Sequence, residues 1–397
     1  MAEENPLLTL PRPIIEALFR SAEVEAQRVK MRVAKLAQAV EQVKPLFRFT
    51  PIKQGRGKLV VAADGSMSPT SSQRLGSEFA IYTAGYLAFK DREVVGERYY
   101  AGSLSWVEGL QTFRTLLRLL MAYTERKAAL EAYRKYKPDY VILDGPYFYF
   151  RGHCRHLRNL EIDVEGLSTG LELIRKVRDM TLELMNTGRA ICVIRRSVMR
   201  AIDGWLLYHH GEEACLRARD KHILTMVMPP MSLWSYQTLL DRDPILYATY
   251  YRFYRRRKQE GKLPKELEAQ RDRLMEQARR DWERKFREDL DMNLNQAPRT
   301  QRYYLRYTAS MPPFEVEAVE GIDVEDFAST FTQFYNEATG LPFPVDLIDN
   351  FISLPRGSTT AFTEEVEARL IRDQSIKDKT TISDYFTYLN PQKKEQA

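Results

Sequence analysis

The sequence predicts an α/β domain built on one mixed sheet flanked by helices, with an N-terminal helical arm and a charged helical insertion. Three observations lead to this prediction. First, apolar, β-branched runs within residues 59–104 are followed by alternating helix-like and strand-like segments up to residue 196. Second, residues 13–45 repeat apolar side chains at spacings of three and four, which is typical of an amphipathic helix. Third, residues 243–297 are rich in charge and poor in apolar residues.

The order of the elements narrows the fold further. We expect strands at 59–64, 78–90 and 93–104, a helix at 106–136, a strand at 140–144, a helix at 169–187 and a strand at 190–196. The short link between the second and third strands favours a hairpin. Three antiparallel strands followed by alternating helices and strands are typical of the RNase H-like fold, and a sheet of this kind presents functional groups at its strand ends.

The remaining segments complete the predicted organisation. After the insertion we expect strands at 302–309 and 314–321, a helix at 323–338 and a polar, mobile tail at 373–397. The predicted units are an arm (1–50), a main domain (51–350, with the insertion at 243–297) and a C-terminal helix with a mobile tail (351–397).

Composition limits the cellular setting and the class of partner. The chain has 397 residues, with 60 Lys and Arg against 54 Asp and Glu, so its net charge of +6 leaves room for a local basic groove that would suit a polyanion. The three cysteines (Cys154, Cys192 and Cys215) are scattered and odd in number, which argues against a disulfide framework. The acidic start predicts no signal peptide, and no run approaches the roughly 20 apolar residues of a membrane span. We therefore expect a cytoplasmic protein with no membrane partner.

Two similar runs deliver carboxylates to predicted strand ends. "VVAADGS" ends its apolar run at Asp64, and "VILDGPY" ends at Asp144. Asp-Gly after a strand is also ordinary turn chemistry, which is the alternative for either run alone. On neighbouring strands, however, the two carboxylates would lie side by side. Converging carboxylates can hold Mg²⁺ or Mn²⁺ ions for two-metal phosphodiester hydrolysis, so the pair predicts a metal-dependent hydrolase.

A third acid is expected from the helix between these strands. Glu125 shares its helical face with Met121 and Ala128, so it lies on the apolar stripe that faces the sheet, whereas Glu131 lies on a solvated face. A carboxylate aimed at a core needs a partner. A metal ion would provide one. The alternative is that Glu125 lies at the edge of the stripe and extends its carboxylate to solvent, or that it forms an ion pair with Arg118.

The order and spacing of these motifs resemble the NurA nuclease family. The similar segments are "VVAADGS", the helical Glu125, "VILDGPY", "ICVIRRS" and "GLPFPVDLID". The resemblance implies an RNase H-like fold, a homodimer and Mn²⁺-dependent (or Mg²⁺-dependent) cleavage of DNA, with single-stranded endonuclease and 5′-to-3′ exonuclease activity. It also implies a hexameric DNA translocase of the HerA type as a partner in end resection and double-strand break repair. On this resemblance Asp64, Glu125 and Asp144 fall on the metal-binding, catalytic acids.

The closing segment departs from the family pattern at two positions. Leu341 stands where the family has Tyr, and Asp349 stands where it has a closing His. An aspartate can still bind a hard cation, so Asp349 is a fourth predicted metal-binding and catalytic residue, with Asp346 one turn earlier as the fallback. The departures also leave an alternative function, namely a non-catalytic DNA-end-binding or scaffold protein that keeps the same fold.

Basic and aromatic residues near the predicted acids are candidates for DNA contacts. Arg151 and Tyr147 follow Asp144, and Arg195 and Arg196 end a strand on the presumed catalytic edge. Arginine can clamp phosphates and aromatic rings can stack on unpaired bases, although such aromatic stripes are often core. The nearby "RGHCRH" invites a zinc interpretation, but its spacing matches no common finger.

The tail contains a possible partner motif. In "KTTISDYF", Ile382 is followed three and four residues later by Tyr385 and Phe386. This pattern resembles a sliding-clamp-binding box, with Lys379 where glutamine is usual, and it predicts the clamp as a possible further partner.

Overall fold

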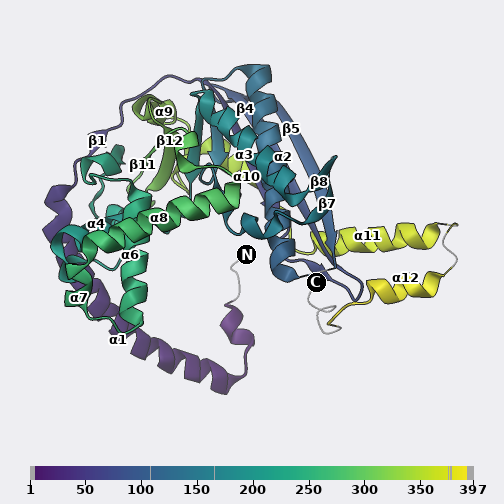
Figure 1. The fold of residues 1–397 in the computed structure, drawn as a ribbon, viewed down its shortest axis with the longest axis horizontal. Helices are drawn as coiled ribbons and strands as arrows, with labels where there is room; N and C mark the ends of the chain where they lie inside the picture. The colour runs from purple at the N-terminus through teal and green to yellow at the C-terminus, as the bar shows by residue number, and fades with distance from the viewer. Residues whose placement is uncertain (1–4, 108, 165, 374, 376–377, 391–397) are drawn as a thin grey trace.

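The computed structural model describes residues 5–107, 109–164, 166–373, 375 and 378–390. Its centre is a ten-stranded mixed sheet (Figure 1). The sheet consists of β1 (Thr50–Pro51), β2 (Leu59–Met67), β3 (Ser72–Gln73), β4 (Glu78–Lys90), β5 (Glu93–Trp106), β6 (Tyr140–Asp144), β9 (Ala190–Ile194), β10 (Ser232–Ser235), β11 (Thr300–Arg306) and β12 (Phe314–Val319). Two small sheets pair β7 (Glu161–Val164) with β8 (Leu167–Thr169), and β13 (Tyr335–Asn336) with β14 (Leu341–Pro342).

The strand order places the predicted catalytic strands at the middle of the sheet. The order is β1-β10-β11-β12-β9-β6-β2-β4-β3, with β5 paired to β4. β2 is antiparallel to β4 and parallel to β6, and β6 is parallel to β9. The strands β12, β11, β10 and β1 then continue as antiparallel neighbours. Because β2, β6 and β9 run in the same direction, their carboxyl ends meet at one edge of the sheet.

Helices surround this sheet. They are α1 (Arg12–Val43), α2 (Leu110–Tyr136), α3 (Gly170–Asn186), α4 (Ala201–His210), α5 (Asp220–Val227), α6 (Pro244–Gln259), α7 (Pro264–Ala269), α8 (Arg271–Leu290), α9 (Val324–Thr330), α10 (Phe343–Ile352), α11 (Ser358–Arg372) and α12 (Lys379–Phe386). No helix in the described ranges combines the length and the apolar character needed to span a bilayer.

Alternation along the central strands gives the sheet two cores. Val61 and Leu143 pack with Ala128 of α2 and Leu184 of α3 on one face. Ala62, Ile142 and Val193 pack on the opposite face with α9 and α10, for example with Ile348. Successive side chains of a strand point to opposite faces, so each buried strand serves both layers. The predicted mixed sheet flanked by helices is confirmed.

The charged insertion is part of a packed helical lobe, which we define as α4 to α8. The expectation that residues 243–297 lack core residues is wrong, because tyrosines supply much of the core. Tyr247, Tyr250 and Tyr254 on α6 are buried together with Leu274 and Met275 of α8. The lobe also begins earlier than predicted, with α4 and α5, and the short strand β10 returns the chain to the sheet before α6.

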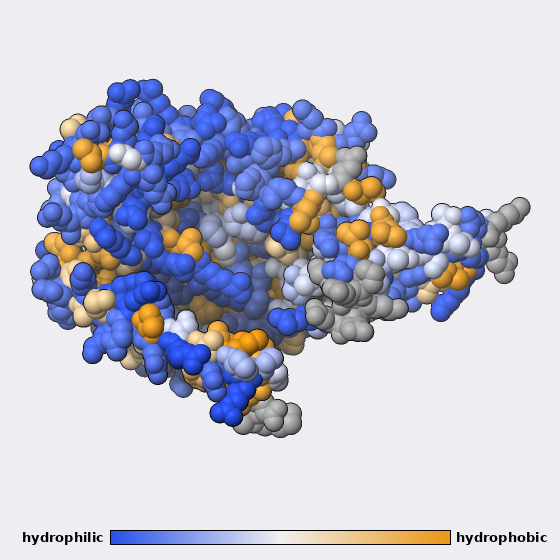
Figure 2. All heavy atoms as spheres, turned by 90° about the horizontal axis from the view of Figure 1, so that it is seen from below, coloured by the Kyte–Doolittle hydropathy of each residue, from blue (hydrophilic) through white to orange (hydrophobic). Residues whose placement is uncertain are grey.

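The helical arm agrees with its predicted range, and it packs on the helical lobe near its C-terminal end. Val40 is buried, and Leu36, Ala39 and Val43 pack beside it on the core of the lobe. The rest of α1 projects below the molecule (Figure 1). In Figure 2, apolar patches interrupt the hydrophilic surface near the free end of the arm. The exposed apolar side chains of the arm are Leu7, Leu8, Leu10, Ile14, Leu18, Phe19, Val24, Val29, Met31 and Val33.

Two expectations near the C-terminus are wrong. The helix expected at 323–338 ends at Thr330, because the chain turns there to bury Phe331 and to pair β13 with β14. The tail is not mobile over 379–386: these residues form α12, which buries Phe386 against Phe79 of β4, with ring centroids 5.5 Å apart. Residues 391–397 of the predicted tail lie outside the described residues.

Candidate active site

The sheet brings the two strand-end aspartates together. Ala63 on β2 pairs in parallel register with Leu143 on β6, so Asp64 and Asp144, one residue further along each strand, are neighbours at the carboxyl edge. The side chain of Asp64 is 4% exposed and that of Asp144 is 24% exposed. Asp64 is therefore enclosed by the protein, whereas Asp144 is partly open to solvent.

Glu125 reaches the same edge from α2, because a glycine lets the helix come close. A Cβ atom on Gly65 would lie 2.9 Å from Cγ of Met121 and 3.4 Å from Oε2 of Glu125. Glu125 is 1% exposed, whereas Glu131 is more exposed and binds Arg98 and Tyr100. The helical phase thus separates the two glutamates in the way that the sequence predicts.

The side-chain partners of Glu125 are not Arg118, the partner in the alternative interpretation. Arg118 donates to the carbonyl of Gly152 at 2.8 Å, while Glu125 forms an ion pair with the fully buried Arg126. Tyr149 also donates its hydroxyl to Oε2 of Glu125 at 2.7 Å. Burial raises the pKa of Glu125. The charge of Arg126 and the hydrogen bond from Tyr149 lower it, but the net shift is upward. The carboxylate is consequently held in one orientation by two donors that sequence periodicity did not reveal.

Arg195 connects three of the four predicted acids. It follows β9 and donates hydrogen bonds to both oxygens of Asp144 and to both oxygens of Asp349. Its Nη2 lies 3.6 Å from Oδ2 of Asp64, beyond hydrogen-bond range. The predicted fallback, Asp346, instead accepts a hydrogen bond from Thr339.

Asp64 is the least satisfied member of the group. Its Oδ1 accepts from the backbone N–H of Gly65 at 2.7 Å, while Oδ2 is buried and receives no hydrogen bond from the described residues. Burial raises the pKa of Asp64 well above its usual range, and the charges of Asp144 and Glu125 raise it further. A buried carboxylate oxygen without a donor is costly, so this atom needs a partner that the described residues do not supply.

These acids fit a hard divalent cation. Carboxylate oxygens are the ligands that Mg²⁺ and Mn²⁺ prefer, and a cation would satisfy the orphaned oxygen of Asp64 and relieve its repulsion from Asp144. Within the described part of the chain, no three His, Cys, Asp or Glu side chains group closely enough to hold a metal ion as they stand. The guanidinium of Arg195 contacts Asp144 and Asp349 and reaches toward Asp64, so a cation at Asp64 and Asp144 would compete with Arg195 for Asp144.

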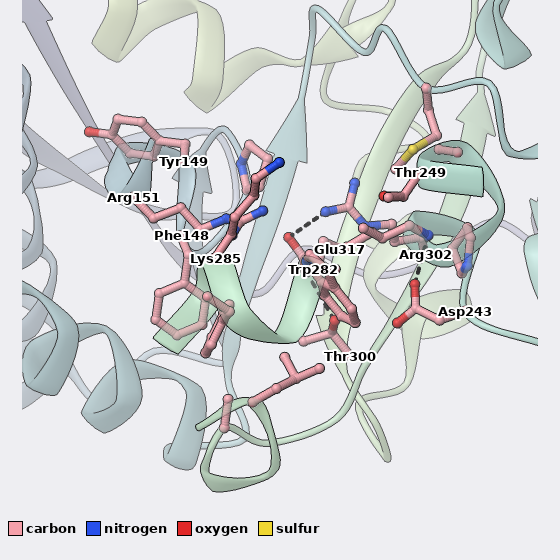
Figure 3. A pocket seen from close by; sticks show the side chains of 18 of the residues that line it. Phe148, Tyr149, Arg151, Asp243, Thr249, Trp282, Lys285, Thr300, Arg302 and Glu317 are labelled. Carbon is pink, nitrogen blue, oxygen red and sulfur yellow. Dashed lines mark hydrogen bonds and ion pairs between the residues drawn. The ribbon is translucent and has the colours of Figure 1, made fainter. Parts of the chain in front are cut away.

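A cavity of 2010 Å³ lies between the sheet and the helical lobe, and its described lining includes chain neighbours of these acids and of Arg195, such as Pro146 and Arg196, rather than the acids themselves. Tyr149 lines it while binding Glu125, and Arg196 lines it directly after Arg195. In Figure 3, Trp282 and Lys285 of α8 lie among these lining side chains, and Arg302 is joined to Glu317. The basic lining residues include Arg151, Arg155, Arg196, Arg200, Arg252, Arg255, Arg256, Lys285, Arg287 and Arg299, the aromatic ones include Phe148, Tyr149, Tyr236, Tyr251, Trp282 and Phe286, and the acidic ones are Asp241, Asp243, Glu283, Asp289, Glu315, Glu317 and Glu320.

Three of the four predicted DNA-contacting residues lie at the cavity or at the acids, and the fourth is buried in the core. Arg151 and Arg196 line the cavity, and Arg195 binds the acids. Tyr147 is a correction: its ring is fully buried and its hydroxyl donates to the carbonyl of Ala190, so it is unavailable for stacking. Its neighbour Tyr149 is the tyrosine of this segment that faces the site.

The predicted clamp-binding residues are occupied within the protein. Ile382 and Phe386 are buried against Phe79, and Arg74 donates to the carbonyl of Phe386 at 3.0 Å. Tyr385 remains 40% exposed. The expectation of a free clamp-binding segment is therefore corrected, because two of its three apolar anchors already serve this fold.

Comparisons with known proteins identify the family of this chain. The fold and the acids define an α/β protein with a carboxylate cluster at the carboxyl ends of its central strands. The sequence model of the NurA domain matches residues 58–286, more than half of the chain. The chain belongs to the NurA domain family.

Solved structures extend the likeness over nearly the whole chain. The crystal structure of the NurA nuclease from Sulfolobus solfataricus matches with a TM-score of 0.57 and 14% identity, covering 93% of this chain and 99% of that one. A crystal structure of NurA with manganese matches with a TM-score of 0.50 and 11% identity, covering 90% and 99%. At these identities the matches show the shared fold. None of the curated proteins compared with the chain matches it.

Proposed function

We propose that this protein is a metal-dependent DNA nuclease that hydrolyses phosphodiester bonds at the edge formed by Asp64, Glu125 and Asp144. The observation that carries the proposal is the buried, unpartnered Oδ2 of Asp64 beside two further carboxylates. Membership of the NurA family and the likeness to a manganese-bound NurA structure support Mn²⁺ or Mg²⁺ as the cofactor.

The residues at the site would have different roles in hydrolysis. Asp64 and Asp144 would hold the cation, and a bound cation would supply water activation and neutralise charge on the phosphate. Arg126 and Tyr149 orient Glu125 at the same edge. Arg195 binds a phosphate oxygen through its planar fork of donors. Hydrolysis adds the water oxygen to phosphorus and protonates the departing sugar oxygen.

The cavity supports a single DNA strand as the substrate. Its arginines suit successive phosphates, and rings such as Tyr149, Phe148 and Trp282 suit unpaired bases, since base stacking on aromatic side chains is sequence-tolerant. The family resemblance adds single-stranded endonuclease and 5′-to-3′ exonuclease activity in end resection, with a HerA-type translocase as the partner. Trp282→Ala should weaken binding of a single-stranded oligonucleotide by about 1–3 kcal/mol.

The decisive experiment is an assay of labelled single-stranded and duplex oligonucleotides with the purified protein. We expect degradation of the single strand with Mn²⁺, none with EDTA, and weak action on duplex ends without the translocase. A protein that binds DNA ends tightly but leaves every substrate intact in Mn²⁺ and in Mg²⁺ would instead establish the alternative, a non-catalytic end-binding or scaffold protein.

The exposed arm supports a homodimer. Its apolar side chains, such as Ile14, Leu18 and Phe19, are exposed on a helix that packs on the helical lobe near its C-terminal end. A second copy would cover them through a two-fold contact. We expect light scattering to give a dimer for the intact chain and a monomer for the double variant Ile14→Glu, Leu18→Glu, with Arg20→Gln as the control. An unchanged dimer in the double variant would assign the arm another role.

A further inference from the structure

Arg195 is bound twice, and its two partners lie in different surroundings. Its Nε and Nη2 donate to Asp144 at 3.0 and 2.7 Å, and its Nη1 and Nη2 donate to Asp349 at 2.9 and 3.2 Å. Each carboxylate thus uses both oxygens on the same guanidinium. Such two-pronged pairs fix the orientation of an arginine as well as its position.

Asp144 belongs to the enclosed acids, whereas Asp349 lies on the outer side of Arg195. Burial raises the pKa of Asp64, and the neighbouring charges that shift it most are those of Asp144, Glu125 and Arg195. Asp349 comes from α10, and its side chain is 39% exposed. Asp349 therefore faces Arg195 rather than the unsatisfied oxygen of Asp64.

The helix that carries Asp349 is firmly seated. Val345, Ile348 and Ile352 of α10 are buried in the core beneath the sheet. Asp349 lies directly beside this apolar stripe, between Ile348 and Ile352 in the sequence. A carboxylate on a tightly packed helix has a fixed position, because close packing prevents the helix from shifting. Asp349 can therefore hold a long and flexible arginine side chain in place.

We propose that Asp349 is a positioning residue for Arg195 and not a ligand of the cation. When the cation binds Asp144, Asp349 keeps the guanidinium of Arg195 beside the acids, where it can bind a substrate phosphate. This inference rests on the proposed nuclease function. It corrects the expectation that Asp349 binds metal.

The balance of charge agrees with this division of roles. Arg195 stays paired with Asp349, and Arg126 stays paired with Glu125. Asp64 and Asp144 then leave two negative charges, which one divalent cation neutralises. We therefore expect a single high-affinity cation per chain, in contrast to the two-metal site that the sequence predicts.

A double-mutant cycle on Mn²⁺ binding tests the proposal without any measurement of activity. Calorimetry on EDTA-stripped protein would compare the wild type, Asp349→Asn, Arg195→Gln and the double variant. We expect Arg195→Gln to tighten Mn²⁺ binding, because a competing cation is removed. Asp349→Asn should have no further effect in the Arg195→Gln background, since a residue that acts only through Arg195 has nothing left to hold.

Two results would show that Asp349 is a ligand of the cation. If Asp349→Asn weakens Mn²⁺ binding by about tenfold or more in the Arg195→Gln background, or abolishes a second bound ion, then Asp349 is a ligand and the proposal is overturned. Asp346→Asn, three residues earlier on the same helix, is the matched control and should bind like the wild type. A wild-type protein that binds no Mn²⁺ would disprove the proposed metal site itself, and this outcome is distinguishable from a failure of the positioning role alone.

A second measurement reports on the phosphate. With Mn²⁺ at saturating concentration and a phosphorothioate single strand that resists cleavage, Asp349→Asn and Arg195→Gln should each weaken binding of the strand about three- to tenfold, and the double variant should be no weaker than the Arg195→Gln variant. Asp349→Glu should restore part of the affinity, because it keeps a carboxylate for Arg195. Wild-type affinity in Asp349→Asn, alongside a loss in Arg195→Gln, would refute the positioning role. Thermal melts of each variant identify any loss of folding.

Discussion

Two clusters of buried charge lie on the same sheet, and they differ in whether their carboxylate oxygens have partners. In the first cluster, Arg302 of β11 donates to Glu315 at 2.6 Å and lies 3.2 Å from Glu317. The remaining donors are Thr300 and the backbone N–H of Tyr147, both to Glu317, and the hydroxyl of Tyr304 to Glu315. All four carboxylate oxygens of this Arg302 cluster are therefore satisfied within the protein, although the donor Nε of Arg302 is buried without a hydrogen-bond partner among the described residues.

The second cluster, Asp64 with Asp144, Glu125 and Arg195, contains a buried oxygen that no described residue satisfies. Both clusters place acids beside an arginine, so charge and burial alone do not tell them apart. Acids whose buried oxygens all have donors can maintain a fold, whereas a buried carboxylate oxygen without a donor marks a place where stability is given up for function. The four predictions below, from the largest expected effect to the smallest, test this distinction.

Asp64→Asn and Asp144→Asn should each reduce Mn²⁺-dependent cleavage of single-stranded DNA by about a hundredfold or more, because the cation loses a ligand. Binding of single-stranded DNA should persist, since phosphate contacts come from the cavity. Initial rates and filter-binding affinities would be measured side by side, with Asp346→Asn as the control. Near wild-type rates in either variant would remove that aspartate from the site.

Glu315→Ala should lower the free energy of unfolding by about 3–5 kcal/mol, because it leaves Arg302 buried without its main partner. Glu320→Ala, an exposed acid at the end of the same strand, should change stability by no more than about 0.5 kcal/mol. Urea denaturation of both variants would measure the difference. Equal stability of the two would mean that the Arg302 cluster does not maintain the fold.

Glu125→Gln should lower the rate of cleavage by about ten- to a hundredfold with the fold retained, because its orienting donors remain while its charge is lost. Glu131→Gln, on the exposed face of the same helix, should cleave like the wild type. Single-turnover assays with equal amounts of folded protein would compare them. Identical rates would place Glu125 outside the chemistry.

Asp64→Asn should stabilise the metal-free protein at pH 7 by about 0.5–2 kcal/mol, the usual gain when a destabilised functional site is relieved. The raised pKa of Asp64 means that folding favours its protonated form. Its contribution to stability is present below the unfolded-state pKa and is lost as the pH rises through the folded-state pKa. Melting temperatures in EDTA should therefore converge as the pH falls from 7, and a difference that grows toward acid would contradict the assignment.

Much of the fold follows from patterns within short windows of sequence. The central strands and the helices around them match their predicted ranges, because alternation and helical spacing are local signals. The strands β1 and β10 were missed, since two and four residues are too few to show a pattern. The helical lobe was underestimated because the rings of Tyr247, Tyr250 and Tyr254 carry its core, and tyrosine also suits a surface.

The site was predictable where it depends on strand ends and helical phase, as for Asp64, Asp144 and Glu125. Its arginines were not, because their partners meet only in three dimensions: Arg195 and Asp349 are 154 residues apart in the chain. The segment around Tyr147 and Tyr149 follows no regular period, so the sequence did not show which ring is buried and which faces Glu125.

The attachment of α12 to the edge of the sheet has a consequence for synthesis on the ribosome. Arg74, beside β3, donates to the carbonyl of Phe386, which lies 312 residues later in the chain. At about 5–20 residues per second, this partner emerges roughly 15–60 s after Arg74 does. During that interval the β3–β4 edge has no cover from α12, and uncovered edges recruit other strands. A nascent chain of this protein therefore exposes this edge to pairing with other strands until α12 has been synthesised.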